Sequence, residues 1–264
     1  MTQIKNRGSK KMLVAERQRK IVDLVNERSS IRVTELSNIF GVTEETIRRD
    51  LEKLEKDNLL MRTHGGAVSI EEEQTETSYI EREITNASEK KAIALEAIKS
   101  IETGDQIVLD ASTTAWYMAK ELPDMPLTVL TNSIKVALEL SKKEQIKVIS
   151  TGGSLLTQSL SYVGPLAERS LGMYHVNKAF LSCKGVHLEK GLSDFNESQA
   201  LVKKQMMEIA DETVLMVDSS KFGVRSFSQI SSLPRVGCII TDSKIDVSIQ
   251  RQLEEKQIKV KIAE

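Results

Sequence analysis

From residue 88 to the end of the chain, short apolar runs alternate with helical stretches. This alternation constrains the fold more than any other feature, because strands separated by helices typically form an α/β domain with a mainly parallel sheet. The predicted strands are Gln106–Asp110, Leu127–Thr131, Ile146–Ser150, Lys178–Ser182, Thr213–Val217 and Val236–Thr241. The first predicted helix is capped by Ser88, the next begins at Ala115, and the others cover 133–142, 164–171, 196–210 and 246–254. We therefore predict a Rossmann-like α/β domain over residues 88–264.

Residues 12–68 have a different pattern, which predicts three helices followed by a hairpin. Apolar positions at helical spacing begin at Leu13, and Arg17 is expected on the polar side of that helix. Thr34 is expected to cap a second, short helix that ends at Gly41. The residues expected on the buried side of the second helix are Leu36, Ile39 and Phe40. A third helix follows almost at once, so a short turn joins the two.

Thr43 is a good N-cap for the third helix, in which Ile47, Leu51 and Leu54 recur at the spacing of one buried face. Helix, short turn and helix is the helix-turn-helix pattern. The residues expected on its exposed face or at its tip are Thr43, Glu45, Thr46, Arg48, Arg49 and Lys53. Arginine can bind guanine edges or phosphates with its forked donors, so this face predicts binding to double-stranded DNA. A merely solvated charged face is the alternative interpretation.

The segment Leu59–Val68 predicts a strand, a glycine turn and a returning strand. Such a hairpin behind the third helix forms a wing, in which Arg62 and His64 are expected near the phosphate backbone. His64 is not expected to bind a metal, because no second His or Cys lies at ligand spacing. Residues 1–66 carry 14 Lys and Arg against 10 Asp and Glu, whereas the rest of the chain is net acidic. A basic first domain agrees with a polyanionic partner.

Three further features limit the class of protein. Residues 1–11 are basic and predict a disordered arm, for which a dispensable extension is the preferred interpretation. Cys183 and Cys238 lie in apolar runs and are expected to be core thiols, since two cysteines cannot form a disulfide framework or a four-cysteine zinc site. No apolar run has the length of a membrane span, and no signal peptide opens the chain. We expect a soluble cytoplasmic protein that binds no metal and no cofactor.

Polar residues collect where the predicted strands end, which is where ligands bind to parallel α/β sheets. These residues are Asp110, Ser112, Thr113, Thr114, Thr131, Asn132, Gly152, Gly153, Asp218 and Lys221. Hydroxyls and backbone N–H groups at a helix start can hold an anion, glycines allow close approach, and Lys221 supplies a cation. Each group alone is more often an ordinary cap or turn. Four groups at four strand ends predict a small anionic, hydroxylated ligand, and a phosphorylated sugar has both properties.

Two motifs make the chain resemble the DeoR family of bacterial transcription regulators. They are Thr46-Ile47-Arg48-Arg49-Asp50-Leu51 and Arg62-Thr63-His64-Gly65-Gly66-Ala67. The resemblance continues through the chain and implies a winged helix-turn-helix domain at 12–68 and a sugar-phosphate-sensing domain at 88–264. Between them, the acidic residues 69–87 are predicted to be a linker that is helical from about Thr77 onward. Lys90–Thr114 is also similar to the opening of ribose-5-phosphate isomerase, which implies phosphate contacts at Thr113 and Thr114 with Lys90 nearby.

The second similarity raises an alternative, a sugar-phosphate isomerase with an accessory DNA-binding module. An isomerase needs a positioned carboxylate to move a proton, but the strand that ends at Ser182 continues into Cys183-Lys184-Gly185-Val186, which contains none. The later loop before Glu197 lacks the Lys-Gly-Gly segment that the similarity implies for the enzyme. We therefore predict binding without turnover, with Lys184, Glu197 and Lys203 as further candidates for the ligand site.

The resulting hypothesis is a repressor of a sugar-catabolic operon that forms a dimer or a tetramer. A phosphorylated sugar intermediate is expected to release it from its operator, which is the commoner outcome in the family it resembles. The ligand is expected to act by reorienting the predicted linker, 69–87. A purely structural role in bridging DNA is the third possibility, but it has no need for polar strand ends.

Overall fold

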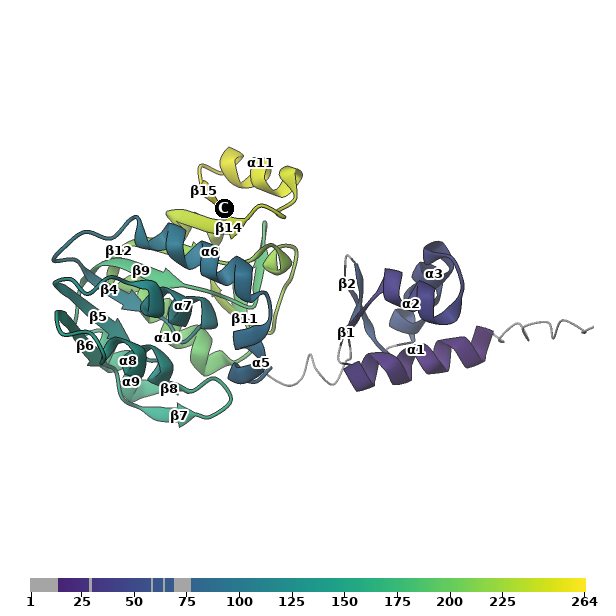
Figure 1. The fold of residues 1–264 in the computed structure, drawn as a ribbon, viewed down its shortest axis with the longest axis horizontal. Coiled ribbons are helices and arrows are strands. Elements are labelled where there is room, and N and C mark those ends of the chain that lie inside the picture. Colours follow the sequence, from purple (N-terminus) through teal and green to yellow (C-terminus); the bar gives the residue numbers. More distant parts are fainter. Residues whose placement is uncertain (1–13, 29, 58, 64, 69–76) are drawn as a thin grey trace, which may run out of the picture. The chain divides into compact units, whose positions relative to one another are not determined.

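The computed structural model describes residues 14–28, 30–57, 59–63, 65–68 and 77–264. The chain divides into two compact units, Met1–Glu76 and Thr77–Glu264, and most of their elements are labelled in Figure 1. The predicted basic arm, part of the predicted linker and His64 lie outside the described residues. The described remainder of the predicted linker, 77–87, belongs to the second unit.

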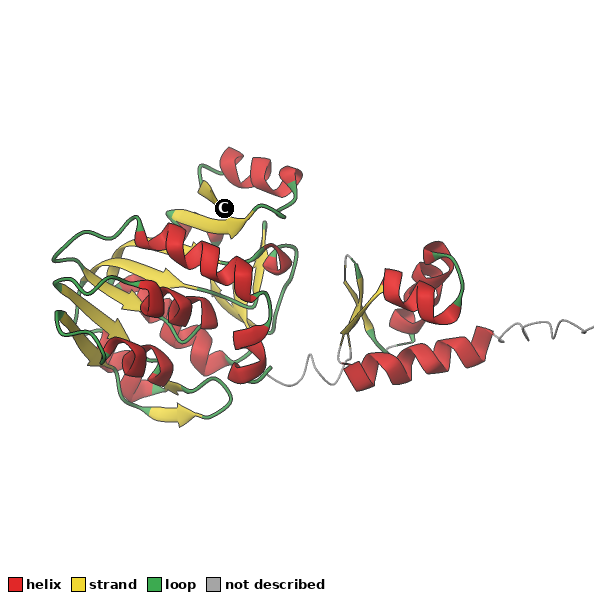
Figure 2. Cartoon of the chain, in the orientation of Figure 1, coloured by secondary structure: helices red, strands yellow, loops and turns green. Residues whose placement is uncertain are grey.

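The described part of the first unit contains three helices and a three-stranded antiparallel sheet, coloured red and yellow in Figure 2. Its elements are α1 (Val14–Arg28), β1 (Ser30–Arg32), α2 (Val33–Phe40), α3 (Glu44–Lys56), β2 (Met61–Thr63) and β3 (Gly66–Val68). β3 lies between β1 and β2. A Cβ at Gly66 would lie 2.1 Å from the carbonyl oxygen of Ile31, so this close pairing requires glycine.

The helices of the first unit confirm most of the predicted pattern and correct three details. Gly41 ends α2 in the left-handed conformation, as predicted, with φ of 61°. α2 begins at Val33, so Thr34 lies inside it and is not the cap. Ile39 was expected on the buried side but is 45% exposed. Arg17 was expected on the polar side of α1 but is buried against α3.

The second unit consists of a seven-stranded parallel sheet with helices on both faces, together with two smaller antiparallel sheets. Its helices are α5 (Tyr79–Ile84), α6 (Ala87–Ile98), α7 (Thr113–Glu121), α8 (Ile134–Leu140), α9 (Pro165–Leu171), α10 (Glu197–Glu208) and α11 (Val247–Glu255). The strands of the main sheet are β4 (Gln106–Leu109), β5 (Leu127–Thr131), β6 (Ile146–Ser150), β9 (Val176–Leu181), β12 (Ala210–Met216), β14 (Cys238–Asp242) and β15 (Lys259–Ala263). The predicted α/β class and parallel sheet are therefore confirmed.

The order of the main sheet is β15-β14-β12-β9-β4-β5-β6, and every neighbouring pair is parallel. The chain passes from β4 outward to β5 and β6, then returns to the other side of β4 at β9 and continues outward to β15. The strand order therefore reverses between β4 and β9. In sheets of this kind the loops after two such strands diverge and leave room for a ligand, so this switch point is the expected place for a site.

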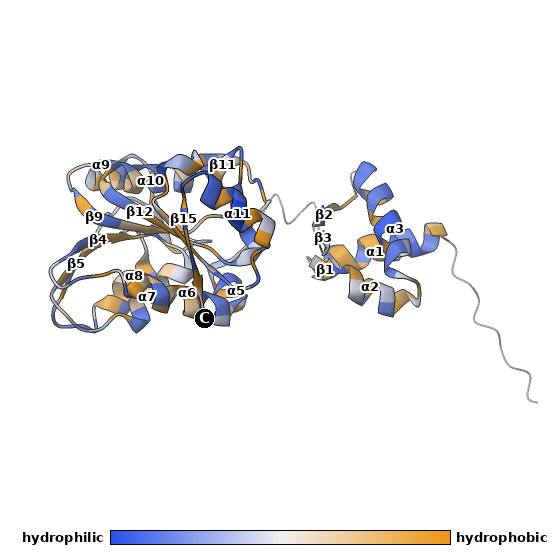
Figure 3. Cartoon of the chain, turned by 90° about the horizontal axis from the view of Figure 1, so that it is seen from above, coloured by the Kyte–Doolittle hydropathy of each residue, from blue (hydrophilic) through white to orange (hydrophobic). Residues whose placement is uncertain are grey.

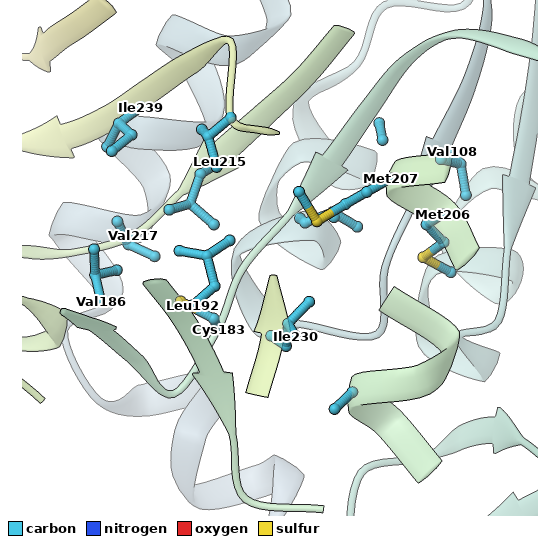
Figure 4. Close-up of a cluster of buried hydrophobic side chains, with 14 of the residues drawn as sticks. Val108, Cys183, Val186, Leu192, Met206, Met207, Leu215, Val217, Ile230 and Ile239 are labelled. Carbon is cyan, nitrogen blue, oxygen red and sulfur yellow. The ribbon is translucent and has the colours of Figure 1, made fainter. Parts of the chain in front are cut away.

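Two hydrophobic clusters cover the two faces of the sheet. Figure 3 shows α6, α7 and α8 on one side of the sheet and α9 and α10 on the other. The alternation of side chains along each strand produces this arrangement: on β4, Val108 belongs to one cluster and its neighbours Ile107 and Leu109 to the other. Figure 4 shows the cluster that contains Val108, in which Met206 and Met207 of α10 pack with strand residues such as Leu215.

The structure also contains elements that the sequence pattern did not predict. These are the edge strand β15, the hairpin of β7 (Ser154–Leu156) and β8 (Ser161–Val163), and the sheet of β10 (Gly185–His187), β11 (Gly191–Asp194) and β13 (Ser228–Ser231). The helix predicted from about Thr77 is present as α5, which begins at Tyr79. The start of α6 also differs from the prediction, because its N-cap is Asn86 and Ser88 lies in the first turn.

Candidate nucleic-acid interface and strand-end site

The third helix of the first unit, α3, has the geometry that its sequence predicts. The hydroxyl of Thr43 accepts a hydrogen bond from the Thr46 N–H at 3.3 Å and so caps the helix. Ile47, Leu51 and Leu54 are buried, which turns the opposite face to solvent. The predicted contact residues on that side, Thr43, Glu45, Arg48, Arg49 and Lys53, are exposed, and Thr46 is half-buried.

The two arginines of the exposed face are held by weak local pairs. Arg48 lies 2.8 Å from a carboxylate oxygen of Glu44, and Arg49 lies 3.3 Å from one of Glu45, each one helical turn away. Exposed ion pairs of this kind contribute about 0.3–0.5 kcal/mol. Either guanidinium can therefore exchange its carboxylate for a phosphate or a guanine edge at little cost.

Asp50 holds α3 against α1. Its carboxylate accepts hydrogen bonds from the Arg17 Nε at 2.6 Å and from the Gln18 side-chain nitrogen at 3.0 Å. Arg17 and Asp50 are both buried, and a buried pair fixes the direction of the two groups it joins. Sequence reasoning missed this pair because its members lie 33 positions apart in the chain.

The predicted wing is present as the antiparallel pair β2 and β3. On it, Arg62 Nε lies 2.7 Å from one carboxylate oxygen of Glu55, and the Arg62 N–H donates to the other oxygen at 3.0 Å. Arg62 is exposed, so its guanidinium lies on the surface of the wing. The position of His64 lies outside the described residues.

In the second unit, Asp110 occupies the switch point of the main sheet. It follows β4, and its carboxylate accepts the N–H of Ser112 at 3.0 Å and the N–H of Ser182, after β9, at 2.9 Å. Asp110 is 1% exposed. It thus joins the two strand ends between which a ligand is expected, and its orientation is fixed by backbone groups.

The N-terminus of α7 lies beside Asp110. Ser112 caps this helix by accepting the N–H of Ala115 at 3.0 Å, and Thr113 and Thr114 form its first turn. All three hydroxyl residues are buried. Free N–H groups at a helix start, the helix dipole and adjacent hydroxyls together favour an anion.

The ends of β5 and β6 contribute the next predicted residues. Thr131 accepts the N–H of Ser133 at 3.0 Å, and Asn132 donates from its side chain to the Tyr162 carbonyl at 2.9 Å. The other side-chain atom of Asn132, Oδ1, is buried and has no partner among the described residues. Gly152 and Gly153 have φ of 62° and 119° and turn the chain sharply after β6.

Lys203 of α10, one of the predicted ligand-site residues, is buried and bound to other groups of the protein. Its ammonium donates to Asp194 at 2.5 Å and to the Ser182 carbonyl at 2.8 Å, and it lies 3.4 Å from Asp110. Burial opposes the charged form, but the attraction of Asp194 and Asp110 outweighs it and holds the pKa of Lys203 above its ordinary value. Lys203 therefore pairs with two carboxylates at once.

Two further candidates lie at the surface. The side chain of Lys184, after β9, is exposed, and so is that of Glu197, the first residue of α10. The segment from Cys183 to Val186 presents no carboxylate, and the Cys183 thiol is buried, which raises its pKa to about 12. The two buried carboxylates at this end of β4 and β9, Asp110 and Asp194, are the ones paired with Lys203.

A second cationic group lies where β12 ends. Asp218 is buried and lies 4.0 Å from the Lys221 ammonium. Burial disfavours its charge, but Lys221 and hydrogen bonds from Ser220 hold the pKa of Asp218 below its ordinary value. The neighbouring Lys90 is also buried, and burial, then the charge of Lys221, lowers its pKa to about 8.

Lys90 also contacts α5, which sequence reasoning did not include in the site. Its ammonium donates to the carbonyls of Arg82 and Thr85 at 2.5 and 2.7 Å. Next to them, Asn86 donates to Asp218 at 3.2 Å. The low apolar content before Tyr79 indicated a linker, and the burial of Tyr79 did not follow from that pattern.

The described residues contain no cluster of three or more His, Cys, Asp or Glu that could hold a metal ion. None of the helices in the described ranges is long and apolar enough to cross a bilayer.

Comparisons with known proteins agree with the division of the chain into two units. Residues 17–73 match the DeoR-like helix-turn-helix domain, and residues 85–243 match the DeoR C terminal sensor domain. The chain is 66% identical over 249 residues to the uncharacterized HTH-type transcriptional regulator YulB of Bacillus subtilis, which covers 94% of this chain and 96% of that protein.

Two more distant relatives have opposite regulatory names. The L-fucose operon activator of Haemophilus influenzae is 37% identical over 90% of this chain and 96% of its own length. The putative aga operon transcriptional repressor of Escherichia coli O157:H7 is 32% identical over 93% of each chain.

A winged helix-turn-helix unit followed by a parallel α/β unit defines a transcription regulator of the DNA-binding class. The chain belongs to the DeoR family of transcriptional regulators. It is a regulator and not an enzyme, as the sequence predicts.

Proposed function

We propose that this protein is a repressor that leaves its operator when a phosphorylated sugar binds at the switch point of the main sheet. The observation that carries the proposal is the N-terminus of α7, where Ser112, Thr113 and Thr114 surround free N–H groups next to Asp110. An anion is favoured there, and a sugar hydroxyl can bind to the neighbouring polar groups.

The cations of the second unit support a phosphate at this end of the sheet. The charges of Lys90 and Lys221 repel each other, and both attract the carboxylate of Asp218. A phosphate dianion between two lysines relieves their mutual repulsion, so its binding is favoured over that of a neutral sugar. The other residues proposed for the ligand site are Thr131, Asn132, Gly152, Gly153, Lys184, Glu197 and Lys203.

The DNA-binding part of the proposal uses the exposed face of α3 and the wing. Arg48, Arg49 and Lys53 would contact base edges and phosphates in the major groove, and Arg62 the backbone beside it. Thr43, Glu45, Thr46 and His64 complete the proposed interface. Two copies in a homo-oligomer would place two α3 helices on half-sites about one turn of DNA apart.

One relative is named an activator and another a repressor, so the proposed release from DNA by the ligand is tested directly. The test selects a duplex from random DNA with the full-length protein and measures its affinity by fluorescence anisotropy, with and without three- to six-carbon sugar phosphates. We expect one of them to weaken binding roughly 30–150-fold, the range of a coupling of about 2–3 kcal/mol. Tighter binding with the sugar phosphate would contradict the proposed release from the operator.

The ligand site has its own control. Thr114→Val replaces a buried hydroxyl at the start of α7 by a methyl group of similar size. We expect this variant to bind the selected duplex normally and to lose most of the response to the sugar phosphate. A normal response in Thr114→Val would place the phosphate elsewhere.

A further inference from the structure

α5 and the residues that flank it, 78–86, cross the strand-end side of the main sheet; we name them the α5 segment. At one end, the Tyr79 N–H donates to the Gln158 carbonyl in the β7–β8 turn at 2.9 Å. In the middle, the Tyr117 hydroxyl of α7 donates to the Glu83 carbonyl at 3.1 Å. At the other end, Asn86 binds Asp218 after β12. The segment therefore contacts the β7–β8 turn, helix α7 and the strand end after β12.

Tyr79 is the side chain of this segment that packs inward. It is 2% exposed, and its hydroxyl is buried without a hydrogen-bond partner among the described residues. The Lys135 ammonium lies 5.4 Å from the centre of its ring, and the Arg82 guanidinium lies 5.8 Å from it. These cations hold the ring through its face and leave the hydroxyl at the ring edge unoccupied. Buried hydroxyls are nearly always bonded, so one without a protein partner is available to bond a ligand or a water molecule.

The surroundings of the Tyr79 hydroxyl connect it with the switch point. Burial raises the pKa of Tyr79, and the charges of Glu83 and Asp110 raise it further. The hydroxyl is therefore neutral, can both donate and accept, and lies within electrostatic range of Asp110.

A second unpartnered atom lies on the strand end next to β4. Asn132 Oδ1 is buried without a partner in the described part of the chain. The amide nitrogen of the same side chain, Nδ2, donates to the Tyr162 carbonyl in β8. Tyr79 is bound to Gln158 in the turn that precedes β8. The same hairpin thus positions a hydroxyl and an amide oxygen, which together complement the donors and acceptors of a polyol.

We propose that the Tyr79 hydroxyl binds a hydroxyl group of the sugar part of the ligand, with Asn132 Oδ1 as a second contact, and that the α5 segment is one wall of the site. This inference rests on the proposed function. It makes Tyr79 a specificity-determining residue that distinguishes a sugar phosphate from phosphate alone. It also places a ligand contact on the first element of the second unit, the element that follows the DNA-binding unit in the chain.

The test uses isothermal titration calorimetry on the full-length protein with inorganic phosphate and the same panel of sugar phosphates. Tyr79→Phe removes the hydroxyl and keeps the ring. We expect it to bind the sugar phosphate preferred by the wild-type protein about tenfold more weakly, which is the effect of one hydrogen bond. Its affinity for inorganic phosphate stays within twofold of wild type, whereas Thr114→Val loses affinity for both.

The matched control is Tyr117→Phe, which removes a hydroxyl that contacts the same segment but already has a partner. We expect this control to bind all ligands within twofold of wild type and to unfold at a lower temperature. Tyr79→Phe without ligand should unfold at the same or a higher temperature, because the hydroxyl that is removed makes no hydrogen bond within the protein. A lower unfolding temperature together with an equal loss for every ligand would assign Tyr79 a structural role and overturn the inference.

The remaining outcomes separate this inference from the proposed function. If Thr114→Val loses binding and Tyr79→Phe binds the sugar phosphate like wild type, the inference is wrong and the proposed function stands. If Tyr79→Phe loses as much affinity for inorganic phosphate as for the sugar phosphate, the hydroxyl contacts the phosphate and its assignment to the sugar is wrong. If the wild-type protein binds no member of the panel, the proposed function fails and the inference fails with it.

Discussion

Arg17 Nε lies 2.6 Å from Asp50 Oδ2, and this buried contact joins α1 to the side of α3 that faces away from the proposed DNA surface. We expect Asp50→Ala to lower the free energy of unfolding of the first unit by about 3–5 kcal/mol, because it leaves the Arg17 charge buried and unpaired. Urea unfolding followed by circular dichroism measures the change.

A double variant, Arg17→Met with Asp50→Leu, separates the buried charge from the packing. Replacing a buried ion pair by apolar groups of similar size is often neutral, so we expect this variant to recover most of the stability lost in Asp50→Ala. A loss below 1 kcal/mol in Asp50→Ala would contradict the interpretation that the pair anchors α3.

Arg49→Ala tests the exposed face of α3. We expect affinity for the selected duplex to fall by about 1–3 kcal/mol if Arg49 binds a base edge, with relaxed preference at one position of the site. Anisotropy titrations with point-substituted duplexes measure both effects. Lys99→Ala, which removes an exposed lysine of the second unit, is the control and should bind every duplex like wild type. An unchanged Arg49→Ala affinity would remove this residue from the interface.

Local patterns in the sequence predicted much of this fold. The stripe of Ile47, Leu51 and Leu54 gave the orientation of α3, because burial along a helix repeats every three or four residues. Strand-length apolar runs gave six strands of the parallel sheet for a related reason: a strand covered on both faces must be apolar throughout. The polar residues at the ends of these strands followed from the same boundaries.

What the sequence left out depends on contacts between distant residues. β15 alternates lysine with apolar residues and lies at an edge, so its pattern is weaker than that of a buried strand. Tyr79 is bonded to Gln158 and Arg17 is paired with Asp50, and in both cases the partner lies far away in the sequence. Lys203 was predicted near the strand ends, but its pairing with Asp194 follows from β11, which no local pattern indicated.

The lowered pKa of Lys90, about 8, predicts how ligand affinity depends on pH. If the charged ammonium holds the phosphate, affinity should fall by up to about tenfold per pH unit above pH 8, as Lys90 loses its proton. Calorimetric titrations between pH 7 and 9.5 measure this decrease. In Lys90→Arg the cation stays charged, so the decrease should disappear.

The stability of the ligand-free protein should show the opposite sign. Between about pH 8 and 10.5 the unfolded chain keeps the Lys90 proton that the folded chain has lost. The contribution of Lys90 to the free energy of unfolding therefore rises with pH in this window.

An affinity for the ligand that does not change between pH 7 and 9.5 would show that Lys90 does not hold the phosphate.

Lys203→Met tests the buried charges at the switch point. The change leaves Asp110 and Asp194 without their cation, and we expect the free energy of unfolding of the second unit to fall by about 3–5 kcal/mol. Thermal and urea unfolding measure it, with the exposed Lys99→Met as the matched control. A loss no larger than that of the control would mean that the two carboxylates do not need Lys203.

The same trio of Lys203, Asp110 and Asp194 has a consequence for how a bound metabolite would be treated. Both acids are committed to a lysine that keeps its proton, so neither is available to move hydrogen between the carbons of a sugar. A compound held beside them would depart chemically unaltered. The amount of protein bound at the promoter would then rise or fall whenever the concentration of that compound changes. The protein would not consume the compound by binding it.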